Sequence, residues 1–352
     1  MKTLKLIFNS LFSNAPVMEA RNQPWYIALA LFIASILLAT YPTFNAINDR
    51  EGSAFLSGNT YSIENGLVAF TEALDTEDVD LVVIKDSSGE EESFQLVNQG
   101  SAWNSAFTTT LEDEPNFPFF AFNVNNQLRL RVFYQGDQTN EASNEFINRL
   151  LVLEAGDDAI GTFLFLGTET VYMYVYNPNG LSEGTVNGEG FLTAFSGTYH
   201  EIEPGTNLVN FARVDINGNA INNANVTTYV DEVFANWLNF FDLSFAYTKS
   251  VLILAQSGLT LVVNALMAFL MSVVIFIMTR GKTNPNRHFK FGETMKIGAW
   301  SLFSPALLTI VAGALFPEFA GTAFVLFVGL RLMWLSSRYL RPVDVVQTPV
   351  KK

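Results

Sequence analysis

Cysteine is absent from the 352 residues, so the chain has no disulfide, no thiolate metal ligand and no cysteine nucleophile. Histidine occurs only at His200 and His288, which leaves little imidazole for general base chemistry or a zinc site. Charged residues make up 15% of the chain, whereas 49% of its residues are hydrophobic. The hydrophobic residues are concentrated in a few segments, which is typical of a membrane protein.

Three catalytic motifs are incomplete. Gly281-Lys282-Thr283 resembles the end of a phosphate-binding loop, but Phe276 stands where that motif requires glycine. His200-Glu201 lacks the second histidine of a zinc-protease HExxH motif because Pro204 occupies its position, and no GxSxG nucleophile elbow occurs. The sequence therefore predicts no catalytic residue, no cofactor and no enzymatic activity.

Four segments carry almost no charge and are long enough to cross the roughly 30 Å hydrocarbon layer of a membrane as helices. The predicted transmembrane helices are 24–42, 250–279, 297–316 and 319–337. A cleavable signal peptide is the alternative for the first segment. An uncleaved anchor is favoured, because the apolar stretch is longer than usual for a signal peptide and is preceded by 23 residues.

Acidic and basic residues are separated along the chain, since residues 43–248 contain 30 Asp and Glu but only 6 Lys and Arg. Basic residues near the ends of spans are retained in the cytoplasm. They lie at Lys2, Lys5, Arg21, Arg280, Lys282, Arg287, Lys290, Lys296, Arg338, Arg341, Lys351 and Lys352. We therefore expect a multi-pass protein of the plasma membrane of a bacterial cell. Residues 1–23, 280–296 and the tail 338–352 would be cytoplasmic, and residues 43–248 extracytoplasmic.

The predicted extracytoplasmic domain is rich in β-branched and aromatic residues separated by turn signals, which predicts an α+β fold. The expected strands are 81–85, 128–133, 162–167, 170–176 and 207–216. The expected helices are 62–74, 143–153 and 230–247. The predicted fold class is thus a membrane protein with four transmembrane α-helices and an α+β extracytoplasmic domain.

The N-terminal segment 1–23 is amphipathic. Helical spacing places five apolar residues on one face: Leu4, Ile7, Phe8, Leu11 and Phe12. Such a helix either lies in the cytoplasmic headgroup layer of the lipid bilayer or forms a cap that packs under the bundle. The sequence leaves both interpretations open.

Four acidic residues, Asp75, Glu77, Asp78 and Asp80, are closely spaced on a predicted turn, which is how calcium sites begin. The loop is not completed by further ligands. Solvated acidic turns are therefore the favoured interpretation, and no other metal site is expected.

Arg331 is the only ionisable residue well inside a predicted span, which makes it a candidate for interaction with a partner. It lies about two turns from the cytoplasmic end, so its side chain could instead extend to the headgroups. Arg287 and Lys290 in the basic loop are further candidates for interaction. Trp103 and Phe119 could stack on a sugar or contact a protein, although aromatic residues in a Phe-rich domain are usually core.

Three stretches carry a family resemblance: LIFNSLF at 6–12, SIENGLV at 62–68 and FKFGETMKIGAWSLFSPALL at 289–308. They resemble a bacterial membrane family often labelled maltodextrin utilization protein. That family has one N-terminal span, an exported domain and C-terminal helices, and a basic loop leads into a span with a central proline, as with Pro305 here. The resemblance implies a role in sugar import. The longer and more acidic exported domain of this chain departs from the family.

Three functions are compatible with these observations. The favoured one is a non-enzymatic accessory or regulatory subunit of a larger membrane assembly, in particular a carbohydrate ABC importer, as the resemblance implies. Its partners would be other integral membrane subunits. The second is a stand-alone receptor whose exported domain holds a small neutral ligand, such as a sugar, in an aromatic-lined pocket. A transporter or intramembrane enzyme is least favoured because the spans contain so little charge. The acidic domain disfavours nucleic acid as a partner.

Overall fold

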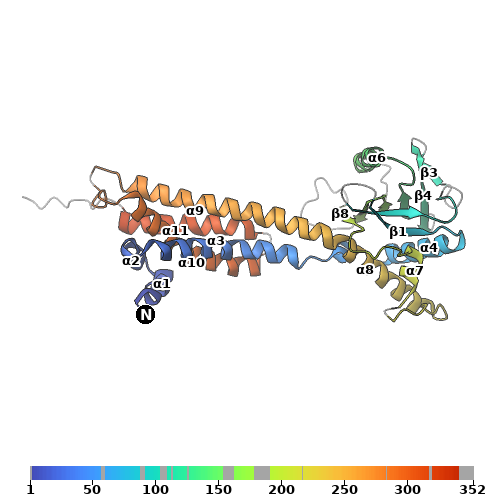
Figure 1. The fold of residues 1–352 in the computed structure, drawn as a ribbon, viewed down its shortest axis with the longest axis horizontal. Coiled ribbons are helices and arrows are strands. Elements are labelled where there is room, and N and C mark those ends of the chain that lie inside the picture. The colour runs from blue at the N-terminus through green and yellow to red at the C-terminus, as the bar shows by residue number, and fades with distance from the viewer. Residues whose placement is uncertain are drawn as a thin grey trace, which may run out of the picture. The chain divides into compact units, whose positions relative to one another are not determined.

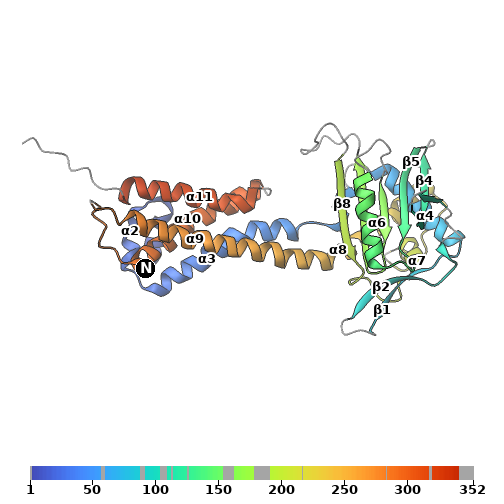
Figure 2. The ribbon, with the colours of Figure 1, turned by 90° about the horizontal axis from the view of Figure 1, so that it is seen from above.

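The chain divides into two compact units in a computed structural model: a helical unit, Met1–Asp49 with Val251–Lys352, and a sheet unit, Arg50–Ser250. Figures 1 and 2 show the elements of each. The structure describes residues 2–56, 60–87, 92–103, 109–111, 114–124, 127–153, 162–177, 191–215, 217–282, 284–316 and 319–340. Most of the predicted tail 338–352 therefore lies outside the described residues.

The helical unit contains the helices that could cross a membrane. Its elements are α1 (Lys2–Phe12), α2 (Ala15–Glu19), η1 (Ala20–Asn22), α3 (Trp25–Asn48), the π-helix η3 (Ile253–Ser257), α9 (Gly258–Met278), α10 (Phe291–Leu315), α11 (Ala320–Leu335) and the π-helix η5 (Ser336–Leu340). Among the described residues, four helical segments are long and apolar enough to span a bilayer, namely Trp25–Asn48, Val226–Met278, Phe291–Leu315 and Gly321–Leu340. This fits a multi-pass membrane protein. The first helix continues past the predicted end at residue 42, because Pro42 is accommodated inside α3.

Helix α10 is the central element of the helical unit, where it contacts α3, α9 and α11. Close approach to α9 depends on Gly298, since a Cβ atom there would lie 2.9 Å from Ser272 Cβ and 3.2 Å from Ser272 Cα. Between α3 and α9, Asn264 Nδ2 donates to Thr40 Oγ1 at 3.3 Å, and both residues are buried. Small residues and interhelical hydrogen bonds of this kind are what hold helices together where no hydrophobic effect acts between them.

The sheet unit combines two sheets with helices. Its elements are η2 (Gly52–Leu56), α4 (Thr60–Thr76), β1 (Leu81–Asp86), β2 (Ser93–Asn98), β3 (Thr109–Leu111), β4 (Glu114–Val124), β5 (Gln127–Tyr134), α6 (Asn140–Leu153), β6 (Phe163–Leu166), β7 (Thr170–Asn177), β8 (Phe191–Thr198), α7 (Leu208–Arg213) and α8 (Val226–Leu252). Strands β1 and β2 pair separately, and the larger sheet has the order β3-β4-β5-β6-β7-β8. Only the pair β5 and β6 is parallel among these described strands, and α6 provides the crossover that a parallel pair requires.

Strand β6 shows why this unit contains so many Phe residues. Its four side chains are all buried and alternate between two cores. Phe163 and Phe165 face the core under α6, whereas Leu164 and Leu166 belong to the core that contains residues of α4 and α8. A strand covered on both faces has no polar side, which accounts for the continuous apolar run. Figure 2 shows α6 lying over one face of the larger sheet, along the direction of its strands.

The prediction of a strand at 207–216 is wrong, because residues Leu208–Arg213 form helix α7. Asn207 caps this helix, and its side-chain Oδ1 accepts from Val209 N at 2.8 Å and from Asn210 N at 3.4 Å. The other strands and the helices expected in this unit are confirmed, with ends that differ by up to five residues.

Candidate functional site

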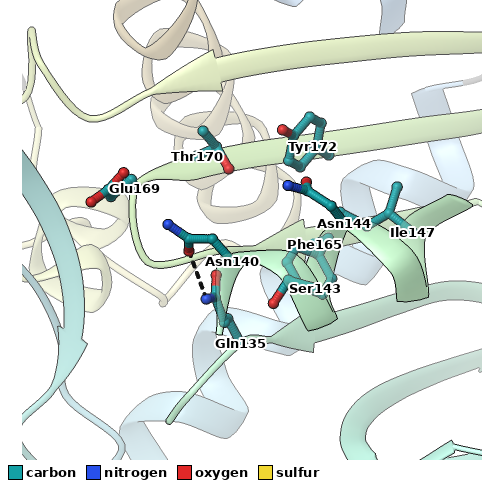
Figure 3. A pocket seen from close by; sticks show the side chains of 9 residues that line it. All are labelled: Gln135, Asn140, Ser143, Asn144, Ile147, Phe165, Glu169, Thr170 and Tyr172. Carbon is teal, nitrogen blue, oxygen red and sulfur yellow. Dashed lines mark hydrogen bonds between the residues drawn. The ribbon is translucent and has the colours of Figure 1, made fainter. Parts of the chain in front are cut away.

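A cavity of about 90 Å³ lies beside the first two turns of α6 and the turn between β6 and β7 (Figure 3). We call it the α6 pocket. Its lining consists of Gln135, Asn140, Ser143, Asn144, Ile147, Phe165, Glu169, Thr170 and Tyr172. The residues come from α6, from β6, β7 and the turn between them, and from the segment that follows β5.

Helix α6 directs four of these side chains to one wall of the pocket. Asn140, Ser143, Asn144 and Ile147 are spaced i, i+3, i+4 and i+7, so they share one helical face. The helix begins next to the pocket because Thr139 Oγ1 accepts a hydrogen bond from the backbone N–H of Ala142 at 3.2 Å. The cap and the spacing together fix this polar face against the sheet.

Gln135 fixes the opposite wall, and it is only 4% exposed. Its Oε1 accepts from Thr168 N at 2.8 Å, while its Nε2 donates to Gln138 O at 2.7 Å and to Asn140 Oδ1 at 2.9 Å. The last of these bonds is drawn in Figure 3. One buried amide thus joins the β6–β7 turn, the loop before α6 and the first residue of α6. Because its donors and acceptor are used in this way, Gln135 is a structural part of the site.

The β6–β7 turn is equally constrained. Gly167 N donates to Thr170 O at 2.8 Å, and a Cβ atom at Gly167 would lie 2.6 Å from that same carbonyl oxygen. Tyr199 stabilises the turn, because its hydroxyl donates a hydrogen bond to Gly167 O at 2.9 Å. Tyr199 is fully buried, and this burial raises its pKa well above the ordinary value for tyrosine. It therefore stays protonated and keeps donating.

The α6 pocket offers hydrogen-bonding groups that carry little charge. Ser143 is 3% exposed, and its Oγ has no hydrogen-bond partner among the described residues. An unpaired buried hydroxyl is costly, so a bound molecule or water that hydrogen-bonds to it would be stabilised. Phe165 and the half-buried Tyr172 add apolar ring surface, and Glu169 is the only Asp, Glu, Lys or Arg in the lining. This combination suits an uncharged molecule with several hydroxyl or amide groups.

A second concavity lies within the helical unit. A groove of about 320 Å³ runs between α3 and the segment formed by η3 and α9, and we call it the α3–α9 groove. It is lined by Leu37, Thr40, Tyr41, Phe44, Ile253, Leu254, Ser257, Gly258 and Leu261. At Gly258 a Cβ atom would meet nothing within 4 Å. The π-helical turn η3 widens the helix here, and such insertions are frequent at functional sites.

The structure gives Arg331 partners within the helical unit, where the residue is 5% exposed. Its Nη2 donates to Ser10 O at 2.5 Å and to Ser13 O at 3.2 Å, at the C-terminal end of α1. Its guanidinium carbon lies 4.9 Å from the ring centroid of Trp334. Arg331 therefore joins α11 to α1 and offsets the partial negative charge at that helix end.

The other candidates for interaction separate into exposed and buried residues. Arg287 and Lys290 are exposed. Trp103 is 6% exposed and Phe119 is 4% exposed, so neither aromatic ring presents a surface for a ligand. The indole Nε1 of Trp103 donates to Pro118 O at 3.0 Å, and the Phe119 ring packs against Phe133 at 5.0 Å between centroids. The interpretation of Trp103 and Phe119 as contact residues was wrong, because the Phe-rich sheet unit uses both in its cores.

The four calcium candidates are not brought together. Asp75 pairs with Arg213, and Asp80 Oδ1 accepts from Asn207 Nδ2 at 2.7 Å. Glu77 and Asp78 lie at the end of α4 and in the turn that follows it. Among the described residues no group of three or more Asp, Glu or His side chains could hold a metal ion.

A carboxyl pair links α4 to α8 in the sheet unit. Burial raises the pKa of Glu64, and the neighbouring Asp231 raises it further through charge repulsion and a side-chain hydrogen bond. Glu64 therefore holds its proton to a higher pH than an ordinary glutamate.

No protein-family model, no curated protein and no solved structure matches this chain. The family resemblance of residues 6–12, 62–68 and 289–308 therefore stays an expectation. Function has to be inferred from the α6 pocket and the α3–α9 groove. Sequence reasoning did not identify the α6 pocket, although the polar residues Ser143 and Asn144 at the start of the predicted helix 143–153 were a signal for it.

Proposed function

We propose that this chain is a non-enzymatic membrane receptor whose sheet unit binds a small, uncharged, hydroxyl-bearing molecule outside the cytoplasm. The observation that carries the proposal is the α6 pocket, with the buried and unpaired hydroxyl of Ser143 in its wall. The charge distribution of the chain supports the location, because the acidic residues 43–248 are flanked by segments with an excess of basic residues.

The size and chemistry of the pocket define the ligand class. A volume of about 90 Å³ is below the range of drug-sized sites and has room for several water molecules or one edge of a small sugar or polyol. Amide and hydroxyl groups can donate to and accept from neighbouring hydroxyls of such a ligand. Phosphorylated or carboxylated ligands are disfavoured, because Glu169 would repel them and no cationic side chain lies in the lining.

The test is a thermal-shift screen of the full chain in lipid nanodiscs, with neutral monosaccharides and polyols compared with sugar phosphates and amino acids. A ligand present at 100 times its dissociation constant stabilises by about 2.7 kcal/mol, so neutral hydroxyl compounds should raise the midpoint and charged ones should not. Asn144→Ala should weaken binding by about 2- to 12-fold, the equivalent of one hydrogen bond. Asn148→Ala is the matched control, since Asn148 is exposed one turn further along α6 and outside the lining.

A shift given equally by charged and neutral compounds would overturn the proposal, as would binding that Asn144→Ala leaves unchanged. A pocket that holds only water would give no shift with any member of the neutral panel, and that result would also count against a receptor for this class.

The α3–α9 groove favours a second candidate function, an accessory subunit of a larger membrane assembly. Its open position at Gly258 would allow a helix of another subunit to approach the backbone closely, as small residues do at helix interfaces in membranes. The resemblance to a family linked to sugar import makes a carbohydrate ABC importer the assembly to examine first. The receptor function and the accessory function are compatible if the receptor signals ligand binding to an importer.

This candidate is tested by gentle detergent extraction of the tagged chain from its native membrane, followed by mass spectrometry. We expect other integral membrane subunits in stoichiometric amounts with the unaltered chain and fewer with Gly258→Leu, which fills the groove. Gly329→Leu is the control, because a Cβ atom at Gly329 also meets nothing within 4 Å but lies on α11. Recovery of the chain alone would leave the receptor as a self-contained protein and would refute the accessory role.

A further inference from the structure

Helix α1 presents three different surfaces around its axis. Leu6 and Ile7 pack against the core of the helical unit. Lys5 and Asn9 are exposed and polar. Between these two sectors lies an apolar ridge made of Leu4, Phe8 and Phe12, which are 75%, 64% and 71% exposed. Residues spaced i, i+4 and i+8 form one row along a helix, and the rings of Phe8 and Phe12 meet edge to face with centroids 5.8 Å apart.

The orientation of this ridge is fixed by contacts on the opposite side of α1. Arg331 is buried and donates from Nη2 to Ser10 O and Ser13 O at the C-terminal end of the helix. Ser10 Oγ donates back to Ile7 O at 2.6 Å within the buried sector. Because one end of α1 is held in this way, its rotation is set. These contacts therefore make the Leu4–Phe8–Phe12 ridge point away from the helical unit.

Exposed aromatic residues mark the same end of the helical unit. Trp25 and Tyr26 begin α3 and are 49% and 71% exposed, and Trp334, against which Arg331 lies, is 38% exposed. Lys296 of α10 lies at this end too, because its Nζ donates to carbonyl oxygens of the segment immediately before α3. Trp and Tyr gather where the hydrocarbon of a bilayer meets its headgroups. Figure 1 shows α1 at this end, turned away from the long helices.

The charge at this end complements an anionic lipid surface. Lys5, Lys282, Arg287 and Lys290 are exposed there, and Glu19 is the one exposed acidic residue among the described parts of α1, α2, η1 and the segment 280–296. Basic side chains next to an apolar helical face are typical of helices that lie in the interfacial layer.

We propose that α1 is an interfacial anchor: the Leu4–Phe8–Phe12 ridge inserts into the acyl and headgroup boundary of an anionic bilayer, and Arg331 is the positioning residue that sets its rotation. The two interpretations left open by the sequence thus combine. One side of α1 caps the bundle, and the side next to it enters lipid. This anchor is independent of the α6 pocket and of its ligand.

The absence of cysteine makes the test direct, because single cysteines can be introduced into an otherwise unreactive chain. Nitroxide labels would be placed in the full chain in phosphatidylglycerol-containing nanodiscs by Phe8→Cys, Phe12→Cys and, as the matched neighbour, Asn9→Cys. Power-saturation EPR then compares accessibility to oxygen, which concentrates in lipid, with accessibility to a water-soluble nickel chelate.

Labels at 8 and 12 should be accessible to oxygen and protected from nickel, with an accessibility ratio several-fold above that of the label at 9. Equal nickel accessibility at 8 and 9 would show that the ridge faces water. Protection of 8 and 12 from both reagents would show that protein covers it. Either result would overturn the anchor.

Adding Arg331→Met, which carries no hydrogen-bond donor, to the Phe8→Cys and Asn9→Cys chains tests the positioning role. The difference between labels at 8 and 9 should shrink, because the carbonyl groups of Ser10 and Ser13 lose their donor. An unchanged difference in a correctly assembled chain would refute this role, and Arg331→Lys, which retains a donor, should restore part of the contrast.

Discussion

The close contact between α9 and α10 yields a prediction that can be worked out from single atoms. Gly298→Ala adds one methyl group where Ser272 Cβ and Cα would lie 2.9 and 3.2 Å away. The serine hydroxyl can rotate aside, but Cβ and Cα can move only if the two helices separate. Both residues are buried in the helical unit, so separation also disturbs the packing around them.

The expected cost combines two opposing effects. Replacing a helical glycine by alanine favours the helix by about 1 kcal/mol. Overpacking of a tight interface costs typically about 1–3 kcal/mol. Gly329→Ala is the matched control, since a Cβ atom there meets nothing within 4 Å and only the helix effect applies. Gly298→Ala should therefore be less stable than Gly329→Ala by about 1–3 kcal/mol.

The assay is thermal unfolding of the full chain in one detergent, monitored through the fluorescence of its 5 Trp residues. For a unit of about 150–250 residues, the size range of the helical unit, each kcal/mol corresponds to a shift of about 2–4 °C. Ser272→Gly removes the atoms that block the new methyl group apart from Cα, so the double variant Gly298→Ala with Ser272→Gly should recover much of the loss. Ser272→Ala, which keeps Cβ, should recover less.

Equal midpoints for Gly298→Ala and Gly329→Ala would refute the reasoning, because they would show that α9 and α10 do not approach at Gly298. A loss that Ser272→Gly does not relieve would place the clash elsewhere.

Three further predictions concern a buried hydrogen bond, a carboxyl group with a raised pKa and the expected membrane orientation. Thr71→Val removes the acceptor of the buried Trp237 Nε1 and should cost about 1–3 kcal/mol in the free energy of unfolding, whereas Thr71→Ser should cost less; denaturant unfolding measures both. The folded chain holds the Glu64 proton more tightly than the unfolded chain, so the thermal midpoint should fall as pH rises through the raised pKa of Glu64. Glu64→Gln should flatten that part of the profile, and an unchanged profile would contradict the assignment. In intact spheroplasts a membrane-impermeant maleimide should label Asn219→Cys, whereas Lys282→Cys should react only after lysis; the reverse pattern would overturn the expected orientation.

Periodicity was a reliable guide wherever one environment covered a whole segment. The four long apolar segments predicted the helices that could span a membrane, because length and composition alone decide this property. The alternating and continuous apolar runs predicted β1, β5, β6 and β7, since the side-chain period of a strand is a local property.

Prediction failed where a local signal had two meanings. The stretch at 207–216 has apolar and polar residues that fit a strand. It contains helix α7 instead, which the side chain of Asn207 caps. Trp103 and Phe119 have the composition of a binding surface but lie in the cores of the sheet unit. The acidic residues before β1 are adjacent in sequence, yet Asp75 and Asp80 point to different partners.

The sequence by itself determined the apolar spans, the separation of acidic from basic segments and most strands of the sheet unit, because these depend on composition and on neighbours within a few residues. Only the tertiary structure decided the partners of Arg331, the close approach at Gly298 and the α6 pocket. Each of these brings together residues that are far apart in the chain, as Arg331 and Ser10 are. No local pattern records such a pairing, because it results from how whole helices and strands pack.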